Sequence, residues 1–385
     1  MDRRTITPRT GWAQKVESVG LTYHHTVSPA GAKHLYWDES ACYRFSMAEV
    51  DTLERATNEL HQLCLAAAQH IIDHDRFDQL SIPKAAVPLI RQAWDAEPPA
   101  IYGRFDLAFD GVNPPKLLEY NADTPTALVE ASVAQWYWLQ DVMPGKDQFN
   151  SIHERLVAKW QELKLYLWDA TLAFGYADNP DTEDVMTIHY LRDTAEQAGL
   201  HTQAIRMADI GWHSGMRRFV DLDGRPIGSI FKLYPWEWML HEDFGANVLA
   251  TLDVTQWIEP IWKMLLSNKG ILPILWELNP GHPNLLEARF NDPGGMTHYV
   301  RKPKLSREGA NVMLAGANGV LMTPGQYGDE GYVYQALADL PVFNSRYPVV
   351  GSWVIDGEAA GIGIREGDGP ITDNLSRFVP HFIEA

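Results

Sequence analysis

Apolar residues recur at helical spacing in the first fifth of the chain. Val50, Leu53, Leu60, Leu63, Ala67 and Ile71 follow one another at intervals of three, four or seven positions, which places them on one face of a helix. Ser46 and Glu49 stand directly before this run in the pattern of a capping box, which marks a helix start. The spacing therefore predicts a long scaffold helix that begins after Ser46.

The middle of the chain alternates between helical and strand patterns. The predicted elements are a helix from the Ser151–Glu154 capping box to about Leu163, a buried strand at Leu165–Trp168, a helix that begins at Thr182-Glu-Asp184 and runs through Ala198, and a strand at Gln203–Arg206. Such alternation indicates a partly parallel sheet.

The pattern changes from about Trp257 onward. Residues 262–276 look helical, and after Met296 most segments look like strands that are joined by tight turns. Asp356-Gly357 separates two alternating apolar runs, and Asp-Gly between such runs is a strong hairpin signal. A boundary between lobes is expected near residue 257.

One predicted hairpin carries an unusual concentration of charge. Residues 110–115 have turn chemistry and separate Arg104-Phe-Asp106 from Glu119-Tyr-Asn121. Facing residues in an antiparallel pair share a constant sum, so Asp106 is expected to face Glu119, and Arg104 to face Asn121. Two facing carboxylates repel each other unless a cation lies between them. Mg²⁺ takes such oxygen ligands, and we weigh that reading evenly against a solvated face with an Arg salt bridge.

Composition narrows the class of protein. The chain has 385 residues, of which 45% are hydrophobic and 21% charged, and a net charge of −18, which argues against nucleic-acid binding. The N-terminal residues lack the apolar run of a signal peptide, and no stretch is long and apolar enough for a membrane span. We therefore expect a cytoplasmic protein without a membrane contact. Cys42 and Cys64 are expected to be buried apolar residues rather than nucleophiles.

Other charged positions are weaker signals. The loop from Lys302 to Val312 contains Ser306, Gly309 and several backbone donors, but it matches neither a Walker loop nor a dinucleotide fingerprint. On its own it is better explained as a basic hairpin turn. Lys269 and Arg365 are either surface residues or anion ligands. Glu183 and Asp184 suit the first turn of a helix, where acids are favoured by the helix dipole, and could alternatively hold an amine.

Together these segments resemble the synthetase domain of the glutathionylspermidine synthase family, which has an ATP-grasp fold. The resemblance covers nearly the whole chain. Its most specific segments are Arg104-Phe-Asp106, Leu118–Thr124, Asn268–Pro273, Lys302-Pro303 with Arg307–Asn311, and Tyr334-Gln335 before Leu340-Pro341. It implies an α/β (α+β) fold with a mainly helical part at 1–100, a metal- and substrate-binding α/β region at 101–256 and an ATP-grasp nucleotide-binding region at 257–385.

The resemblance also implies a role for individual residues. By position, Arg104 resembles the residue that stabilises the transition state of phosphoryl transfer. The implied magnesium ligands are Asp106, Glu119 and Asn121; the implied nucleotide contacts are Arg104, Asp106, Lys269, Lys302, Gly309, Gln335, Ala336, Leu337 and Arg365; and the implied substrate contacts are Thr124, Glu183 and Asp184.

The implied activity is ATP-dependent ligation of a carboxylate to an amine through an acyl phosphate, with Mg²⁺ present as two ions. The partners would be a small carboxylate, such as a peptide or glutathione-like thiol, and an amine such as a polyamine. The chain begins at the synthetase portion, so the upstream amidase of bifunctional members is expected to be missing. Leu233 stands where the family has a hydroxyl residue, and Asp184 where it has Glu, so the substrates are expected to differ.

Two alternatives remain at this point. The first is a nucleotide-binding regulatory or scaffold protein that has kept the fold and lost catalysis. The second takes Asp106 and Glu119 as the acid–base pair of a hydrolase.

Overall fold

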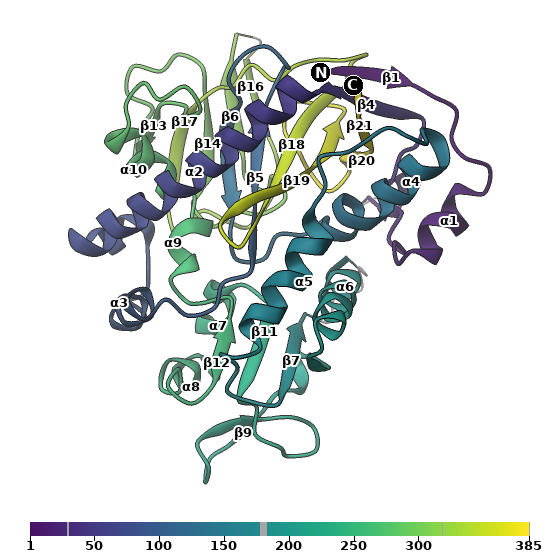
Figure 1. Cartoon of the computed structure of the whole chain (residues 1–385). Coiled ribbons are helices and arrows are strands. Elements are labelled where there is room, and N and C mark those ends of the chain that lie inside the picture. The colour runs from purple at the N-terminus through teal and green to yellow at the C-terminus, as the bar shows by residue number, and fades with distance from the viewer. Residues whose placement is uncertain (29–30, 178–182, 318, 385) are drawn as a thin grey trace.

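The predicted charged hairpin forms two strands of a five-stranded antiparallel sheet at the centre of the molecule (Figure 1). The computed structural model describes residues 1–28, 31–177, 183–317 and 319–384. The strands of this sheet, in spatial order, are β20 (Arg377–Val379), β19 (Glu358–Gly367), β18 (Tyr347–Ile355), β5 (Tyr102–Ala108) and β6 (Lys116–Asn121). The Asp356-Gly357 hairpin is confirmed, because it joins β18 to β19.

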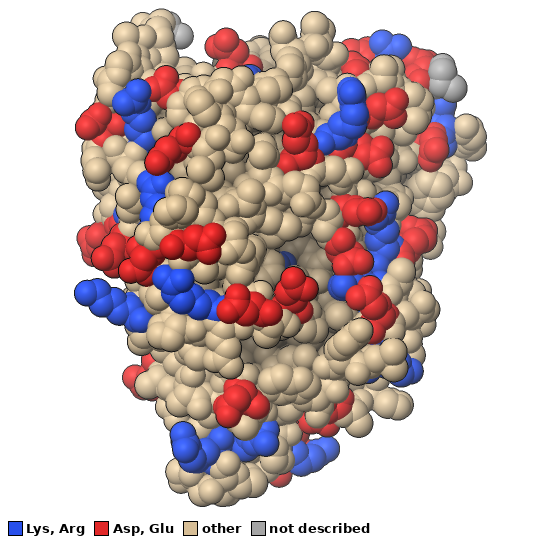
Figure 2. Space-filling model, turned by 60° about the vertical axis from the view of Figure 1, so that its left-hand side comes forward, with Lys and Arg blue, Asp and Glu red and all other residues tan. Residues whose placement is uncertain are grey.

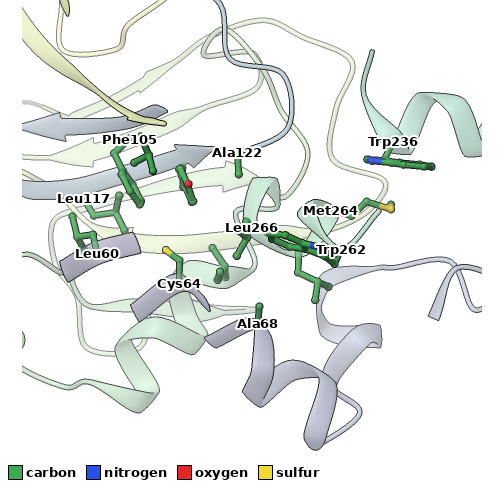
Figure 3. Close-up of a cluster of buried hydrophobic side chains, with 14 of the residues drawn as sticks. Leu60, Cys64, Ala68, Phe105, Leu117, Ala122, Trp236, Trp262, Met264 and Leu266 are labelled. Carbon is green, nitrogen blue, oxygen red and sulfur yellow. The ribbon is translucent and has the colours of Figure 1, made fainter. Parts of the chain in front are cut away.

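The long helix α2 (Met47–Asp73) covers the apolar face of this sheet. Its capping box is formed as predicted, because the side chain of Ser46 accepts from the backbone of Glu49 and Glu49 accepts from that of Ser46. Figure 3 shows that Leu60 and Cys64 point from α2 toward the sheet, where they meet Phe105. The aromatic ring of Phe105 stacks on that of Tyr120 with 3.8 Å between their centroids. Removal of a buried ring of this kind costs roughly 3–5 kcal/mol, so this packing fixes the hairpin from behind.

A second, parallel sheet forms the lower part of the molecule in Figure 1. Its strands, in spatial order, are β12 (Gln256–Ile258), β11 (Ser229–Leu233), β7 (Thr171–Tyr176) and β8 (His201–Arg206). The accompanying helices are α5 (Ile152–Leu163), α6 (Glu183–Gln197), α7 (Trp236–His241) and α8 (Gly245–Leu249). The prediction of a partly parallel sheet is confirmed, while the predicted helix start at Thr182 lies outside the described residues.

The predicted buried strand at Leu165–Trp168 is wrong. The chain turns there after α5, and the exposed fractions of Leu165, Tyr166 and Trp168 are 87%, 60% and 54%. The strand starts at Thr171 instead. The apolar run was misleading because these side chains border a turn in which the backbone of Trp168 donates to Ser229 rather than to a neighbouring strand.

A third sheet is antiparallel and stands beside the charged hairpin. Its strands, in spatial order, are β13 (Ala288–Phe290), β17 (Tyr332–Ala336), β14 (Tyr299–Pro303), β15 (Met313–Gly316) and β16 (Gly319–Met322). The strand-rich character predicted after Met296 is confirmed.

The single helix predicted over residues 262–276 is corrected to two, α9 (Lys263–Ser267) and α10 (Ile271–Leu278). The side chain of Asn268 interrupts the helix, because it donates to the backbone of Leu80 and accepts from the backbone of Gly270. Pro273 then occupies the first turn of α10, where a missing backbone N–H is tolerated. The break presents Lys269 between the two helices.

The two termini lie close together at the top of Figure 1. They meet in a small sheet of β1 (Asp2–Thr5), β4 (Ala41–Ser46) and β21 (His381–Glu384), in which β4 and β21 are parallel. The remaining elements are α1 (Trp12–Ser18), β2 (His25–Val27), β3 (Lys33–Leu35), α3 (Val87–Ala96), α4 (Gln135–Val142), β9 (Gly211–His213), β10 (Arg218–Val220), short 3₁₀ turns at Arg76–Leu80 and Met207–Asp209, and a π-helical turn at Glu130–Ala134.

None of the helices in the described part of the chain is long and apolar enough to cross a membrane. The central sheet takes β5 and β6 from the predicted middle region and β18 to β20 from the predicted C-terminal region, so those regions share a core. Their boundaries stay a prediction.

Candidate active site

The charged hairpin has the predicted register. Arg104 pairs with Asn121 and Asp106 with Glu119 across β5 and β6. Alternate residues point to opposite faces of a strand, so the apolar Phe105 and Tyr120 lie on the α2 side. The other face therefore carries the polar set, and this face is where the site is built.

Positive side chains neutralise Asp106 on this face. Arg104 Nε donates to Asp106 Oδ1 at 2.8 Å, and Arg365 Nη2 donates to Asp106 Oδ2 at 2.5 Å. The exposed fractions of Arg104 and Asp106 are 5% and 4%. Arg365 lies within β19. In the protein alone, arginine thus supplies the cation that was expected beside Asp106.

Glu119 is neutralised by lysine. Lys269 Nζ lies 3.1 Å from Glu119 Oε2. Burial would raise the pKa of Glu119, but the ammonium groups of Lys269 and Lys302 outweigh it and hold that pKa well below its usual range. Burial lowers the pKa of Lys302 to about 8, and Lys269 adds to this while Glu119 opposes it. Glu119 is therefore ionised at neutral pH. Lys302 loses its proton at a pH slightly above neutral, because its pKa is about 8.

A cavity of about 110 Å³ opens beside these lysines. Its charged lining residues are Asp106, Glu119, Lys269 and Lys302, and its apolar walls include Val300, Leu314, Leu337, Leu340 and Ile371. Lys302 Nζ donates to Gln335 Oε1 at 2.7 Å and to the Leu118 carbonyl at 2.9 Å. One cavity thus combines an apolar slot with two ammonium groups, as expected for a flat ligand that carries an anionic end.

The Lys302–Val312 loop closes one side of this cavity. Gly309 lines it with φ at +70°, and a Cβ there would lie 2.5 Å from the Thr372 carbonyl oxygen. Only glycine tolerates both that backbone conformation and that approach. Lys269 Nζ donates to the Ser306 carbonyl at 2.6 Å. The loop and the first lysine therefore form one unit rather than an isolated basic turn.

A second cavity, of about 190 Å³, adjoins the first. Both cavities are lined by Asp106, Glu119, Gly309 and Thr372. The second also contains the predicted substrate residues Thr124, Glu183 and Asp184, together with Arg104, Asn121 and Arg365. The polar face of the hairpin is thus the floor on which the two cavities meet.

Arg307 crosses the second cavity. Its Nη1 donates to the Thr124 hydroxyl at 2.8 Å and its Nη2 to Glu237 Oε1 at 3.0 Å. Its guanidinium carbon lies 5.5 Å from the centroid of the Trp238 ring. Sequence reasoning placed Arg307 only in the Lys302–Val312 loop and missed its place beside Thr124. It also missed Glu237 and Trp238, which carry no spacing signal because they lie on the short helix α7.

Burial raises the pKa of Glu183, and the nearby charge of Glu308 adds to this effect. Arg104 and Arg365 act in the opposite direction. Behind the cavity, burial and then the charge of Glu183 raise the pKa of Glu130 to about 8. The second cavity therefore has an acidic end, where a bound cation would stabilise the ionised form of Glu183.

The structure brings almost all predicted site residues to these two cavities. Leu337 lines the first cavity, and Gln335 accepts a hydrogen bond from Lys302, which also lines it. Ala336 lies between them in the sequence and donates its backbone N–H to the Glu287 carbonyl. No group of three or more His, Cys, Asp or Glu side chains in the described residues could hold a metal ion. The predicted ligands instead combine two carboxylates with the amide of Asn121, which donates to both of them at 3.4 and 3.3 Å.

Residues 3–384 match the family model described as glutathionylspermidine synthase preATP-grasp. The chain belongs to the glutathionylspermidine synthase family. It is 40% identical, over 97% of both chains, to a Haemophilus influenzae protein named "Putative acid–amine ligase". It is 28% identical to trypanothione synthetase of Crithidia fasciculata and 27% identical to the bifunctional glutathionylspermidine synthetase/amidase of Escherichia coli, over 83% and 88% of this chain. The chain spans only 53% and 58% of those two proteins.

The fold has a counterpart among solved structures. A glutathione synthetase-like effector from Globodera pallida superposes with a TM-score of 0.61 over 97% of this chain and 96% of its own, at 10% sequence identity. At that identity the likeness concerns the fold alone. The expectation of a mixed α/β fold of the ATP-grasp type is confirmed.

Proposed function

We propose that this chain is an ATP-dependent carboxylate–amine ligase that forms an amide bond through an acyl phosphate. One observation carries the proposal, namely that the two cavities meet on the Arg104–Asn121 face of the hairpin. A phosphoryl group bound in the first cavity would reach an acceptor in the second without crossing solvent. The membership in a family of ligases and synthetases supports the same reaction.

In the first cavity, Lys269 and Lys302 would bind the phosphates of ATP, while Gly309 would let the loop backbone approach them. Leu337 and its apolar neighbours would enclose the base. Phosphoryl transfer needs positioned positive charge more than a protein nucleophile. That requirement fits a site whose described residues offer lysines and arginines, whereas Cys42 and Cys64 are buried elsewhere.

Asp106, Glu119 and Asn121 fit magnesium by their donor chemistry. Mg²⁺ is usually held by one or two carboxylates together with substrate phosphates, and the hairpin offers two carboxylates on facing positions. A turn of the Asn121 amide would present its oxygen in place of its nitrogen. Asp106 and Glu119 would hold the ion, which would supply neutralisation of the phosphate charge when bound. The proposal includes two such ions.

Arg104 would stabilise the charge that develops on the transferring phosphoryl group. It lines the second cavity beside Asp106, which lines both cavities, and it donates through Nε to Asp106 and through Nη1 to the Thr126 carbonyl. A preorganised charge of this kind lowers the barrier because it need not reorient during the reaction.

The second cavity would take the two remaining substrates. Arg307 and Thr124 would bind the carboxylate substrate, such as a peptide or a glutathione-like thiol. Glu183 and Asp184 would hold an amine such as a polyamine. The acid's carboxylate oxygen attacks the γ-phosphorus and ADP leaves; the amine nitrogen then attacks the acyl carbon, loses a proton and expels phosphate.

The direct test measures ADP release with Mg²⁺, ATP and a panel of carboxylates and amines. We expect turnover that needs both an acid and an amine, and that Arg104→Ala abolishes. Arg155→Ala is the matched control, because Arg155 makes a surface ion pair with Glu358. Nucleotide binding without turnover on any pair would instead favour a scaffold protein, and activity that persists in EDTA without ATP would favour a hydrolase.

A further inference from the structure

A third cavity lies on the reverse side of the hairpin sheet. It has a volume of about 680 Å³, which exceeds both reaction cavities, and shares no lining residue with either of them. It is enclosed by residues of α2, α3, α5 and α9 and by the start of β5. In Figure 2, which turns the side of α3 toward the viewer, the surface is hollowed near its centre and carries acidic side chains beside the opening.

The inner end of this cavity presents a hydrogen-bonding group. His61 lines it with an exposed fraction of 9%, and its Nδ1 is 3.1 Å from the Tyr120 hydroxyl. Its Nε2 has no hydrogen-bond partner among the described residues. A Cβ at Gly357 would lie 3.5 Å from that nitrogen, so the absence of a side chain keeps the space in front of it open. A nearly buried imidazole nitrogen thus points to an external partner.

The walls are largely aromatic and apolar. The rings of Trp94 and Trp262 meet edge to face at 5.2 Å between centroids. Pro98, Pro99 and Leu266 complete this wall. Faces of indole rings attract organic cations as well as apolar groups.

The charges of the lining favour a cation. The lining contains the carboxylates Glu97, Glu162 and Asp356 and the ammonium groups Lys159 and Lys263. Both lysines are already neutralised, because Lys159 Nζ lies 3.1 Å from Glu162 and 2.6 Å from Asp356, and Lys263 pairs with Glu259. Glu97 has no ion pair with any described residue. The chain as a whole carries a net charge of −18, which adds to the attraction.

We propose that this cavity is a binding site for a small amphipathic amine. The apolar body of the ligand would pack against Trp94 and Trp262, its ammonium group would lie toward Glu97, and a polar group at the inner end, or a water, would bond to His61. The site is separate from the amine position proposed beside Glu183. Tyr120 lines it, and in β6 this residue stands between Glu119 and Asn121, whose side chains point to the opposite face.

The test is calorimetric titration of the whole protein at neutral pH with 2-phenylethylamine. Its matched probes are 2-phenylethanol, which lacks the charge, and 3-phenylpropionate, which reverses it. We expect the amine to bind about tenfold more tightly than the alcohol, as a cation–π contact and one exposed charge pair would give, and the carboxylate to give no binding. No binding of the amine, or equal binding of all three probes, would overturn the proposal.

Variants locate the bound amine. Trp94→Leu should weaken amine binding about fivefold and Glu97→Gln about twofold; both residues are partly or fully exposed, so the folded state should survive. Glu183→Gln, or a saturating non-hydrolysable ATP analogue with Mg²⁺, should leave amine binding unchanged. Unchanged binding in Trp94→Leu, or loss of binding in Glu183→Gln, would place the amine elsewhere and refute the site. None of these binding measurements depends on ADP release. A negative result would therefore refute the third-cavity site without bearing on the proposed ligase activity.

Discussion

The two cavities that meet on the charged hairpin differ in how completely their charges are paired. In the first, Lys269 pairs with Glu119 and donates to the Ser306 carbonyl, while Lys302 donates to Gln335 and to the Leu118 carbonyl. In the second, Glu183 has a raised pKa, and Arg307 keeps a buried Nε without a hydrogen-bond partner among the described residues. A closed network fixes one ligand geometry, whereas partly satisfied groups leave room for different ligands. Under the proposed ligase function, nucleotide binding and substrate selection would therefore belong to separate halves of one site.

The largest effect is expected from removing Arg104, the positive side chain that lines the second cavity and bonds to Asp106, which lines both. Arg104→Ala should lower kcat on the order of a thousandfold, because the developing charge on the phosphoryl group loses its fixed partner. The Kd of an ATP analogue should change much less. Steady-state kinetics with calorimetric nucleotide titration measure both. A variant that loses nucleotide affinity and turnover equally would make Arg104 a binding residue instead.

A nucleotide-side change should leave the substrate half intact. Lys302→Met should weaken binding of an ATP analogue on the order of a hundredfold, as expected when one partner of a buried charged contact is removed. Lys304→Met is the matched control, because Lys304 lies two positions later and donates to the Ser81 hydroxyl instead. Calorimetric titration compares the two variants. Equal affinities in both would rule out Lys302 as a phosphate ligand.

A substrate-side change should do the reverse. Glu183→Gln should raise the KM for the amine about tenfold, since one charge pair to the amine is lost, and leave nucleotide affinity unchanged. Glu154→Gln provides the control, because Glu154 is an exposed acid in the first turn of a neighbouring helix. An unchanged KM in Glu183→Gln would remove Glu183 from the amine position.

The smallest expected effect is a pH dependence confined to the nucleotide half. As pH rises from 7.5 to 9.5, Lys302, whose pKa is about 8, loses its proton, and ATP-analogue affinity should fall several-fold. The same shift acts on stability with the opposite sign. Between about pH 8 and the usual lysine pKa the unfolded chain holds more protons, so this residue makes the free energy of unfolding rise with pH. Calorimetry in buffers of different ionisation enthalpy would detect proton uptake on nucleotide binding. Identical pH profiles for wild type and Lys302→Met would contradict the assignment.

The sequence predicted the hairpin register well because side-chain alternation leaves little freedom. A shift of one residue would exchange the polar Asp106 with the buried Phe105, so the pattern and the core agree on one answer. The capping box at Ser46 succeeded for a similar reason, since both of its hydrogen bonds are local.

The failures involve interactions that are distant in the sequence. The helix break at Lys269 depends on the bond from Asn268 to Leu80, which no local pattern reveals. Leu165–Trp168 has the composition of a strand, yet the chain turns there to reach β7. Arg307 reaches the second cavity only through contacts with Thr124 and Glu237, which are far from it in the sequence.

The central claim is that the γ-phosphoryl group of ATP passes to a carboxylate on the face formed by Arg104, Asp106, Glu119 and Asn121. The most direct measurement uses the acid that supports ADP release, labelled with ¹⁸O in its carboxylate. Mass spectrometry of the phosphate formed with ATP, Mg²⁺ and amine should then find one labelled oxygen per phosphate molecule, because the acyl phosphate breaks on the carbonyl side of its bridging oxygen. Amide formation with unlabelled phosphate would contradict an acyl phosphate and, with it, the proposed role of the shared floor.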